Sequence, residues 1–203
     1  PIGITVDTVS GNVRKLPMNF PPLIPSKELK NCIEGSLPYS EVFDGKRFIY
    51  SFSMDENLYV VSPDHHNIQK IKAKSKYIPE LKFRKIPSDF SKTLKTTCEA
   101  ATYGNIIYDK YRQVYYRFAY PESELDDNED FLRILNSGKK EFSIIILDKN
   151  LKILGETKFP PFTYLPHIFY ISNDVLYLIV NHFKLSYFCY FKFLFQKIEL
   201  LNQ

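Results

Sequence analysis

Leu58-Tyr59-Val60-Val61, Asp64-His65-His66-Asn67 and Ile68-Gln69-Lys70-Ile71 read in order as a strand, a tight turn and a second strand. Apolar and β-branched residues on both sides of a polar turn are typical of an antiparallel hairpin. The same cassette occurs earlier, at residues 4–16, and later, at residues 143–154. Recurrence at long spacing indicates an array of structural units, so the sequence predicts a repeat fold.

A second strand–turn–strand pattern accompanies the cassette, at residues 40–52, 105–118 and 167–180. Joined to the cassette it gives four antiparallel strands, the blade of a β-propeller. The sequence therefore predicts an all-β fold, a partial β-propeller of roughly three to four four-stranded antiparallel blades. We expect one domain over residues 1–203, with the end of a preceding blade at 1–25, a blade at 36–76, a blade at 103–159 with an insertion at 121–140, and a blade with a divergent tail at 167–203.

The connections between strands differ in length. Turns within the two patterns are short, whereas the connections at about 19–39, 77–104, 121–140 and 159–166 are long. In a propeller all of these long connections emerge on one face, and long loops on a rigid scaffold commonly carry binding residues. We expect the ligand-binding residues on that face to be Tyr103, Glu122, Asp126, Asp127, Tyr164 and His167.

Two readings of these residues stay open. Tyr103, Tyr164 and His167 flank the strands nearest a central channel, where aromatic platforms suit sugar rings or peptide side chains. The alternative is that they pack the loops. The acidic residues of 122–130 begin like a calcium loop, but Phe131 stands where glycine is needed. A short amphipathic helix from Phe131, with acids at its N-terminus, is the preferred interpretation.

Composition narrows the function classes. Aromatic residues make up 16% of the chain and the formal net charge is +4, which is too mild to indicate a nucleic-acid partner. Four lysines at 70, 72, 74 and 76 share one face of an outer strand, where they deter edge-to-edge pairing. Nucleic-acid binding is the alternative reading of that row. No stretch is long and apolar enough for a membrane helix.

Metal, cofactor and catalytic signals are weak. The His65-His66 pair could be interpreted as part of a metal site. Adjacent histidines on a strand point to opposite faces, however, so a polar turn is the preferred interpretation. The cysteines have no metal-type spacing, and a Cys32–Cys98 bridge is one option in an oxidising compartment. The chain holds none of the common catalytic motifs. We therefore expect no metal, no cofactor and no catalytic residue.

The segments Tyr108-Asp109-Lys110-Tyr111-Arg112-Gln113-Val114-Tyr115-Tyr116-Arg117-Phe118 and Phe142-Ser143-Ile144-Ile145-Ile146-Leu147-Asp148 carry a resemblance. They resemble TolB-like six-bladed β-propeller lipoproteins of unknown function from Bacteroides-type bacteria, over about residues 1–182. The resemblance implies an exported protein of the cell envelope, held to the membrane only through an N-terminal lipid anchor removed from this chain. It also implies that the chain is a fragment of a six-bladed propeller, or pairs with a second copy through open blade faces. The aromatic tail at 184–203 departs from the family pattern.

These expectations combine into a non-enzymatic binding module of the cell envelope, with a glycan, peptide or protein meeting the long-loop face. One alternative is a polysaccharide hydrolase or lyase that uses channel carboxylates and His167. Another is a structural or assembly protein that docks through exposed blade faces.

Overall fold

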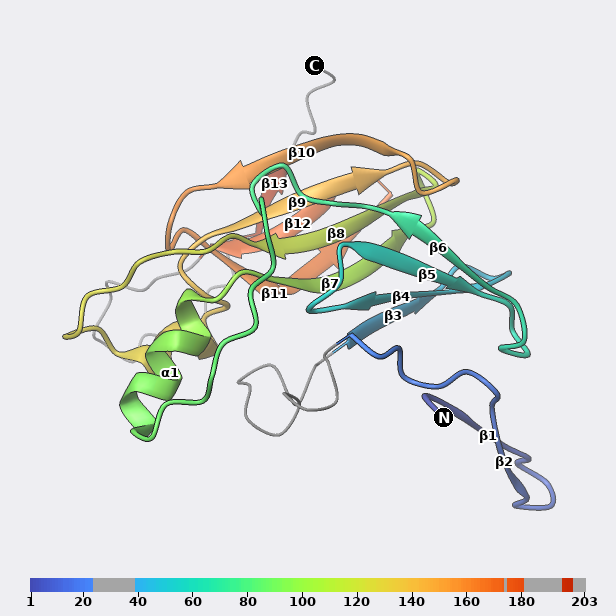
Figure 1. Ribbon diagram of the computed structural model, residues 1–203. Coiled ribbons are helices and arrows are strands. Elements are labelled where there is room, and N and C mark those ends of the chain that lie inside the picture. Colours follow the sequence, from blue (N-terminus) through green and yellow to red (C-terminus); the bar gives the residue numbers. More distant parts are fainter. Residues whose placement is uncertain (24–38, 174, 181–194, 199–203) are drawn as a thin grey trace.

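The computed structural model describes residues 1–23, 39–173, 175–180 and 195–198 (Figure 1). Within these residues the chain is built mainly of antiparallel strands with few helices. The expected all-β class is therefore confirmed. Cys32, Cys189 and most of the predicted tail at 184–203 lie outside the described residues, as does most of the long connection at 19–39.

The strands of the described residues form three larger sheets and one hairpin. Sheet one consists of β3 (Tyr39–Phe43), β4 (Phe48–Phe52), β5 (Asn57–Val61) and β6 (Ile68–Lys72). Sheet two consists of β7 (Thr102–Asp109), β8 (Val114–Tyr120), β9 (Phe142–Leu147) and β10 (Ile153–Phe159). Sheet three consists of β11 (Tyr164–Ile171), β12 (Leu176–Val180) and β13 (Phe195–Ile198). The hairpin pairs β1 (Ile4–Val6) with β2 (Val13–Lys15).

Strand order follows chain order in all three sheets, so each is a simple antiparallel meander. The predicted strands at residues 40–52, 58–71, 105–118 and 143–154 are present. Burial varies with position in the sheet. β9 is almost wholly buried, as expected for a strand covered on both faces, whereas β6 is largely exposed at the edge of sheet one. On that edge Lys72 pairs with Glu56 at 3.0 Å, and Lys70 lies 5.0 Å above the Tyr59 ring.

The sheets pack face to face in series. Side chains of sheets one and two share a buried cluster that includes Ile49, Leu58, Tyr115 and Ile145. The opposite face of sheet two packs on sheet three through a second cluster, to which Tyr116, Phe118, Ile144, Phe159, Leu176 and Leu178 belong. Sheet two therefore has a neighbour on each face, and burial of both apolar faces is the main stabilising term of this arrangement.

The three copies of the strand–turn–strand cassette share the same hydrogen bond in their turns. At the turns β1–β2, β5–β6 and β9–β10, an aspartate oxygen accepts a hydrogen bond from the N–H two residues later. The three aspartates are Asp7, Asp64 and Asp148, with N···O distances of 2.9, 3.2 and 2.8 Å. Such side-chain bonds mimic a backbone turn, which is why a polar residue recurs at this position.

A second repeated device joins neighbouring sheets at their first turns, and we call it a latch. In the β3–β4 turn, Asp44 pairs with Arg47 at 3.0 Å and accepts a hydrogen bond from the Tyr115 hydroxyl of sheet two. Arg47 also donates to the Lys149 carbonyl of sheet two at 2.6 Å. Burial acts to raise the pKa of Asp44, but the hydrogen bonds from Tyr115 and from the turn's own N–H groups outweigh it and lower the pKa.

A similar latch joins sheet two to sheet three. Asp109, the last residue of β7, pairs with Arg112 at 2.6 Å and accepts a hydrogen bond at 3.0 Å from the Tyr116 hydroxyl, which here belongs to the same sheet as the aspartate. Arg112 then donates to the carbonyls of Ser172 and Asn173, in the β11–β12 turn. The face of the molecule that carries these short turns is therefore closed by regular polar contacts.

The described residues hold two helices. α2 (Phe131–Asn136) is the short helix predicted in the 121–140 insertion, and the Asp130 side chain caps it by accepting from the Arg133 N–H at 3.0 Å. α1 (Phe90–Glu99) lies where the sequence predicted only a long connection, with Asp89 as its N-cap. Neither helix is long and apolar enough to span a membrane.

Candidate functional site

The long connections of different sheets assemble into one packed unit, which we call the long-loop face. Cys98 of α1, Leu125 of the β8–β9 connection, and Phe131 and Ile134 of α2 form a buried cluster, with Phe162 of the β10–β11 connection packed against it. Figure 1 shows α1 at the end of the sheets opposite the β5–β6 turn. The predicted separation of long loops from short turns is therefore present in these elements.

Cys98 belongs to this buried cluster as a free thiol. It donates to the Phe131 carbonyl at 3.3 Å, and burial raises the pKa of the thiol to about 11. The suggested Cys32–Cys98 bridge is therefore wrong for Cys98, because its sulfur packs between α1 and α2.

Ion pairs tie the surface of the long-loop face together. Glu122 pairs with Arg84 at 2.5 Å and with Lys82 at 3.4 Å, so the β6–α1 connection is held to the β8–β9 connection. Lys95 of α1 pairs with Asp127 at 2.6 Å, and its hydrogen bond to that carboxylate raises the pKa of Lys95. Exposed pairs of this kind stabilise little individually, so their main effect is to fix loop positions.

Two pockets lie on either side of residues 80–84. One, of about 350 Å³, is lined by Arg84, Glu99, Glu122, Ser123 and Glu124. The other, of about 320 Å³, we call the Tyr103 pocket. Leu81 and Phe83 line the Tyr103 pocket, whereas Lys82 and Arg84 pair with Glu122 on the other side. Glu80, Leu81 and Phe83 thus line the Tyr103 pocket, whereas the side chains of Lys82 and Arg84 extend to Glu122.

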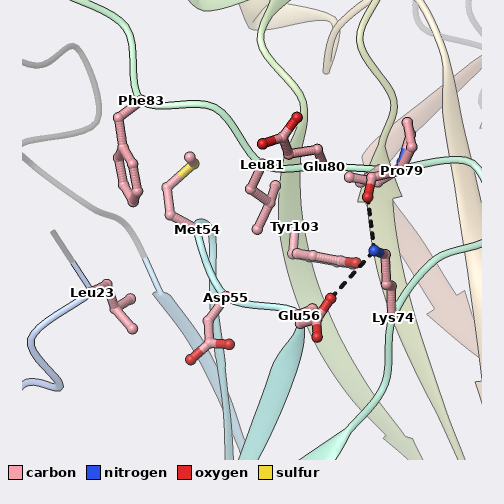
Figure 2. A pocket seen from close by; sticks show the side chains of 11 residues that line it. Leu23, Met54, Asp55, Glu56, Lys74, Pro79, Glu80, Leu81, Phe83 and Tyr103 are labelled. Atoms are coloured by element: carbon pink, nitrogen blue, oxygen red, sulfur yellow. Dashed lines mark hydrogen bonds and ion pairs between the residues drawn. The ribbon is translucent and has the colours of Figure 1, made fainter.

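Both apolar and charged side chains line the Tyr103 pocket, and the apolar residues are the more numerous (Figure 2). It lies between the β4–β5 turn, the β6–α1 connection and the start of β7. Its apolar lining residues are Leu23, Met54, Ile78, Pro79, Leu81, Phe83 and Tyr103. Its charged lining residues are Asp55, Glu56, Lys74 and Glu80. A concave, mostly apolar pocket with a few polar groups is the usual form of a ligand site.

Most polar groups of the pocket bond to one another or to the scaffold. Asp55 accepts hydrogen bonds from the Tyr59 hydroxyl at 2.6 Å and from Asn57. Lys74 donates to the Pro79 carbonyl at 2.7 Å and pairs with Glu56 at 3.5 Å, as the dashed lines of Figure 2 show.

Arg117 of β8 supports the pocket from behind. Its side chain is 0% exposed, and its guanidinium donates to the carbonyls of Asp55, Glu56 and Ala73 at 2.6–2.9 Å. The guanidinium also lies 3.7 Å from the centre of the Tyr103 ring. Burial lowers the pKa of Arg117 to about 10. One buried cation therefore joins the β4–β5 turn, the end of β6 and the Tyr103 ring.

The predicted site residues do not all come together. Tyr103 lines the pocket, but it is buried, and its hydroxyl accepts a hydrogen bond from the Ser75 N–H at 3.0 Å. Glu122 lines the other pocket, and Asp127 pairs with Lys95 beside it. Asp126 is exposed on the same connection.

The last two predicted residues belong to sheet three. Tyr164 packs edge-on against Phe159 at 5.5 Å between ring centres. His167 is exposed and lies beside Gly138, whose backbone has a φ of +88°. Neither residue is among the described residues that line the two pockets. The predicted set thus divides between the two pockets, the acidic connection beside them and the start of sheet three.

The His65-His66 pair lies in the β5–β6 turn, as the polar-turn interpretation predicted. His65 is buried and its Nε2 is 2.7 Å from the Tyr50 hydroxyl, whereas His66 is exposed. In the part of the chain that the structure describes, no three His, Cys, Asp or Glu side chains are grouped as metal ligands.

Sequence reasoning missed Leu81, Phe83 and Arg117. The alternation of apolar and basic residues in Leu81-Lys82-Phe83-Arg84 was the available signal for a two-sided segment. Arg117 gave a signal of a different kind, a lone charge within an otherwise apolar strand.

Comparisons with known proteins place the chain in a family. A family model described as a domain of unknown function, DUF4221, matches residues 4–158. A crystal structure of a DUF4221 member from Bacteroides vulgatus is 30% identical, with a TM-score of 0.77, and the match covers 92% of this chain and 51% of that chain. The chain thus spans about half the length of that relative. The search of curated proteins found no match. The narrower TolB-like resemblance has no support in these comparisons, and the chain belongs to the DUF4221 family.

Proposed function

We propose that this chain is part of a β-propeller that serves as a non-enzymatic binding module, with its ligand on the long-loop face. The propeller arrangement is supported by three antiparallel sheets packed in series. It is also supported by contacts of β7, the first strand of sheet two, with β3 and β4, the first and second strands of sheet one. The Ile106 N–H donates to the Ser40 hydroxyl and the Ser51 hydroxyl donates to the Gly104 carbonyl, both at 3.1 Å. First strands that approach one another are expected around the axis of a propeller.

The observation that carries the binding proposal is the contrast between the two faces. Latches close the short-turn face, whereas the long-loop face is assembled from connections of different sheets and holds both pockets. A rigid sheet scaffold that presents structured loops on one side is a common design for recognition. Glycans, peptides and proteins are the ligand classes within this proposal.

An envelope location and an N-terminal lipid anchor are part of the same proposal. They rest on the sequence resemblance to Bacteroides-type lipoproteins. The family relative from Bacteroides vulgatus is consistent with a protein from that group of bacteria.

Docking through an open sheet face is the second candidate, and one observation favours it. Tyr39, Phe43 and Ile68 of sheet one are 40–48% exposed. Partly exposed apolar residues on one sheet suit a further sheet or a partner chain. The hydrolase alternative has less support. It needs carboxylates that are available to a substrate, and those of Asp55 and Glu56 in the Tyr103 pocket already have partners within the protein.

A binding screen on two variants tests the proposed function. One variant carries Glu80→Ala, Glu122→Ala, Asp126→Ala, Asp127→Ala and His167→Ala on the long-loop side, and the control carries Lys46→Ala and His66→Ala on the short-turn side. We expect a glycan or peptide found by array screening to bind the control at full strength and the first variant at least about tenfold more weakly. Full binding by the first variant would reject the assignment of the face.

A further inference from the structure

We propose that the Tyr103 pocket binds a large apolar side chain of a peptide or protein segment, with a basic residue next to it. This inference rests on the proposed function, because it requires that the long-loop face binds a ligand. It narrows the ligand from glycan, peptide or protein to a polypeptide, and it names residues outside the sequence-predicted set.

The apolar walls define what the pocket can hold. Met54, Leu81 and Phe83 are among the residues that line a space of about 320 Å³ (Figure 2). That volume lies at the lower end of the range of small-molecule pockets and suits one leucine-sized or phenylalanine-sized side chain with part of its backbone. Burial of such a side chain contributes roughly 1.5–3 kcal/mol, which is enough for an anchor.

The polar groups of the Tyr103 pocket disfavour a sugar as the ligand. Sugar recognition combines an open aromatic face with free hydrogen-bonding groups. Here one face of the Tyr103 ring is covered by Arg117, and the Tyr103 hydroxyl already accepts from Ser75. Asp55 likewise has its hydrogen-bond partners within the β4–β5 region.

The same argument disfavours an anionic ligand. Lys74 is the cation among the described lining residues of this pocket, and it pairs with Glu56 while donating to the Pro79 carbonyl. A carboxylate or phosphate entering here would have to displace Glu56 and would meet the negative charge of Glu80. Anion binding would therefore cost existing interactions.

The charge around the pocket instead favours a basic neighbour for the anchor. Glu80 is exposed at the Tyr103 pocket, and Glu124 is exposed at the adjoining one. Within the described residues, neither carboxylate takes part in an ion pair. A lysine or arginine beside the apolar side chain would complete these charges, which aids both selectivity and the rate of association.

The pocket is also preorganised, which suits side-chain recognition. Arg117 holds the carbonyls of Asp55 and Glu56 and the Tyr103 ring in fixed positions. The Lys82 and Arg84 pairs with Glu122 hold the opposite wall. A wall that does not need to be ordered on binding lowers the entropic cost of association.

A peptide-display selection tests this inference on the whole chain. A phage library of random twelve-residue peptides is selected on the immobilised protein, and the enriched peptides are titrated by fluorescence polarisation. We expect enrichment of a Phe, Leu or Met beside a Lys or Arg. Phe83→Ala should weaken the enriched peptides by about tenfold. Glu80→Gln should weaken them and reduce the salt dependence of binding.

Phe90→Ala is the matched control, because Phe90 is an aromatic residue of the same face that is 71% exposed and does not line the pocket. It should leave binding unchanged. If Phe83→Ala lowers the thermal midpoint, the test is decided by Glu80→Gln. The Glu80 side chain is exposed, so removal of its charge leaves the core intact.

The outcomes separate the inference from the proposed function. Enriched peptides without an apolar anchor, or equal binding by Phe83→Ala and the unaltered protein, would overturn the inference. A glycan from a parallel array that binds the protein and is lost in the long-loop variant, but not in Phe83→Ala, would overturn the inference and support the proposed function. Failure of both libraries to bind would reject both.

Discussion

Arg117 is a charged residue whose side chain is fully buried. A guanidinium removed from water is costly unless its donors are used, and here they meet backbone carbonyls and the Ser51 hydroxyl. The carbonyls come from the residue after β6 and from the β4–β5 turn, and that of Glu56 also accepts a hydrogen bond from the Ala73 N–H at 3.0 Å. Arg117 thus satisfies acceptors at the ends of sheet one from a position within sheet two.

Replacement of Arg117 by Met should destabilise the protein strongly. Each hydrogen bond to a charged group contributes roughly 1.5–3 kcal/mol, partly offset by relief of the buried charge, so we expect a loss of at least about 2 kcal/mol. Urea unfolding followed by fluorescence measures this loss. Arg14→Met, in the exposed strand β2, is the matched control and should change stability little. Equal stability of the two variants would contradict the role given to Arg117.

Tyr115 and Tyr116 give a second test at the scale of single groups. Each hydroxyl donates to the aspartate of a latch, Asp44 or Asp109. Tyr115→Phe and Tyr116→Phe should each lower the free energy of unfolding by roughly 1.5–3 kcal/mol, because each removes one hydrogen bond to a charged carboxylate. Tyr111→Phe removes a hydroxyl from a half-exposed ring in the same region and should have almost no effect. Indistinguishable denaturation curves for the three variants would count against the latches.

At the scale of elements, the two helices differ in what stabilises them, local sequence in α2 and tertiary contacts in α1. α2 begins after an acidic residue and has apolar residues at helical spacing, so the sequence alone predicts it. α1 reads Phe-Ser-Lys-Thr-Leu-Lys-Thr-Thr-Cys-Glu, with three threonines of low helix propensity. Its stability depends on Cys98 and Leu94, which pack against α2.

The N-cap of α2 can be tested directly. Asp130→Ala should lower stability by about 1 kcal/mol, the usual cost of losing a side-chain cap. Asp126→Ala, four residues earlier on the same exposed connection, is the control and should cost little. Chemical denaturation gives both values. An equal loss in the two variants would mean that general charge, rather than the cap, is responsible.

At the scale of the whole molecule, buried tyrosines predict sensitivity to alkali. Burial raises the pKa of Tyr50 and of Tyr116 from the ordinary value of 10.0 to about 12. Between these values the unfolded chain holds fewer protons than the folded chain, so unfolding releases protons and stability falls as pH rises. Urea midpoints should therefore decline from pH 10 to 12. A flat profile over that interval would refute the prediction, and Tyr50→Phe should make the decline shallower.

The sequence predicted much of the fold because the strand signals are local. Turn aspartates and alternating apolar residues define β3 to β6 and β7 to β10 without reference to distant parts of the chain. The Tyr103 pocket could not be predicted in this way. Its walls come from four separate segments of the chain. The role of Arg117 is visible only when packing of the sheets brings the carbonyls of Asp55 and Ala73 to it.

The candidate residues show the same limit. Glu122 and Asp127 were found because long acidic connections are visible in the sequence, and both lie on the long-loop face. Tyr103 was a candidate binding platform, with packing of the loops as the alternative, and one face of its ring is covered by Arg117. Exposure of an aromatic ring depends on what packs over it, which one sequence does not show.

The latches also determine how a disturbance spreads through the array. Each latch joins only one pair of neighbouring sheets, so a substitution that breaks the first latch leaves the second intact. Sheet two, flanked on both sides, should retain its amide protons longest under deuterium exchange, while the flanking sheets fray first. Unfolding is therefore expected to begin at the two outer sheets and to reach sheet two last.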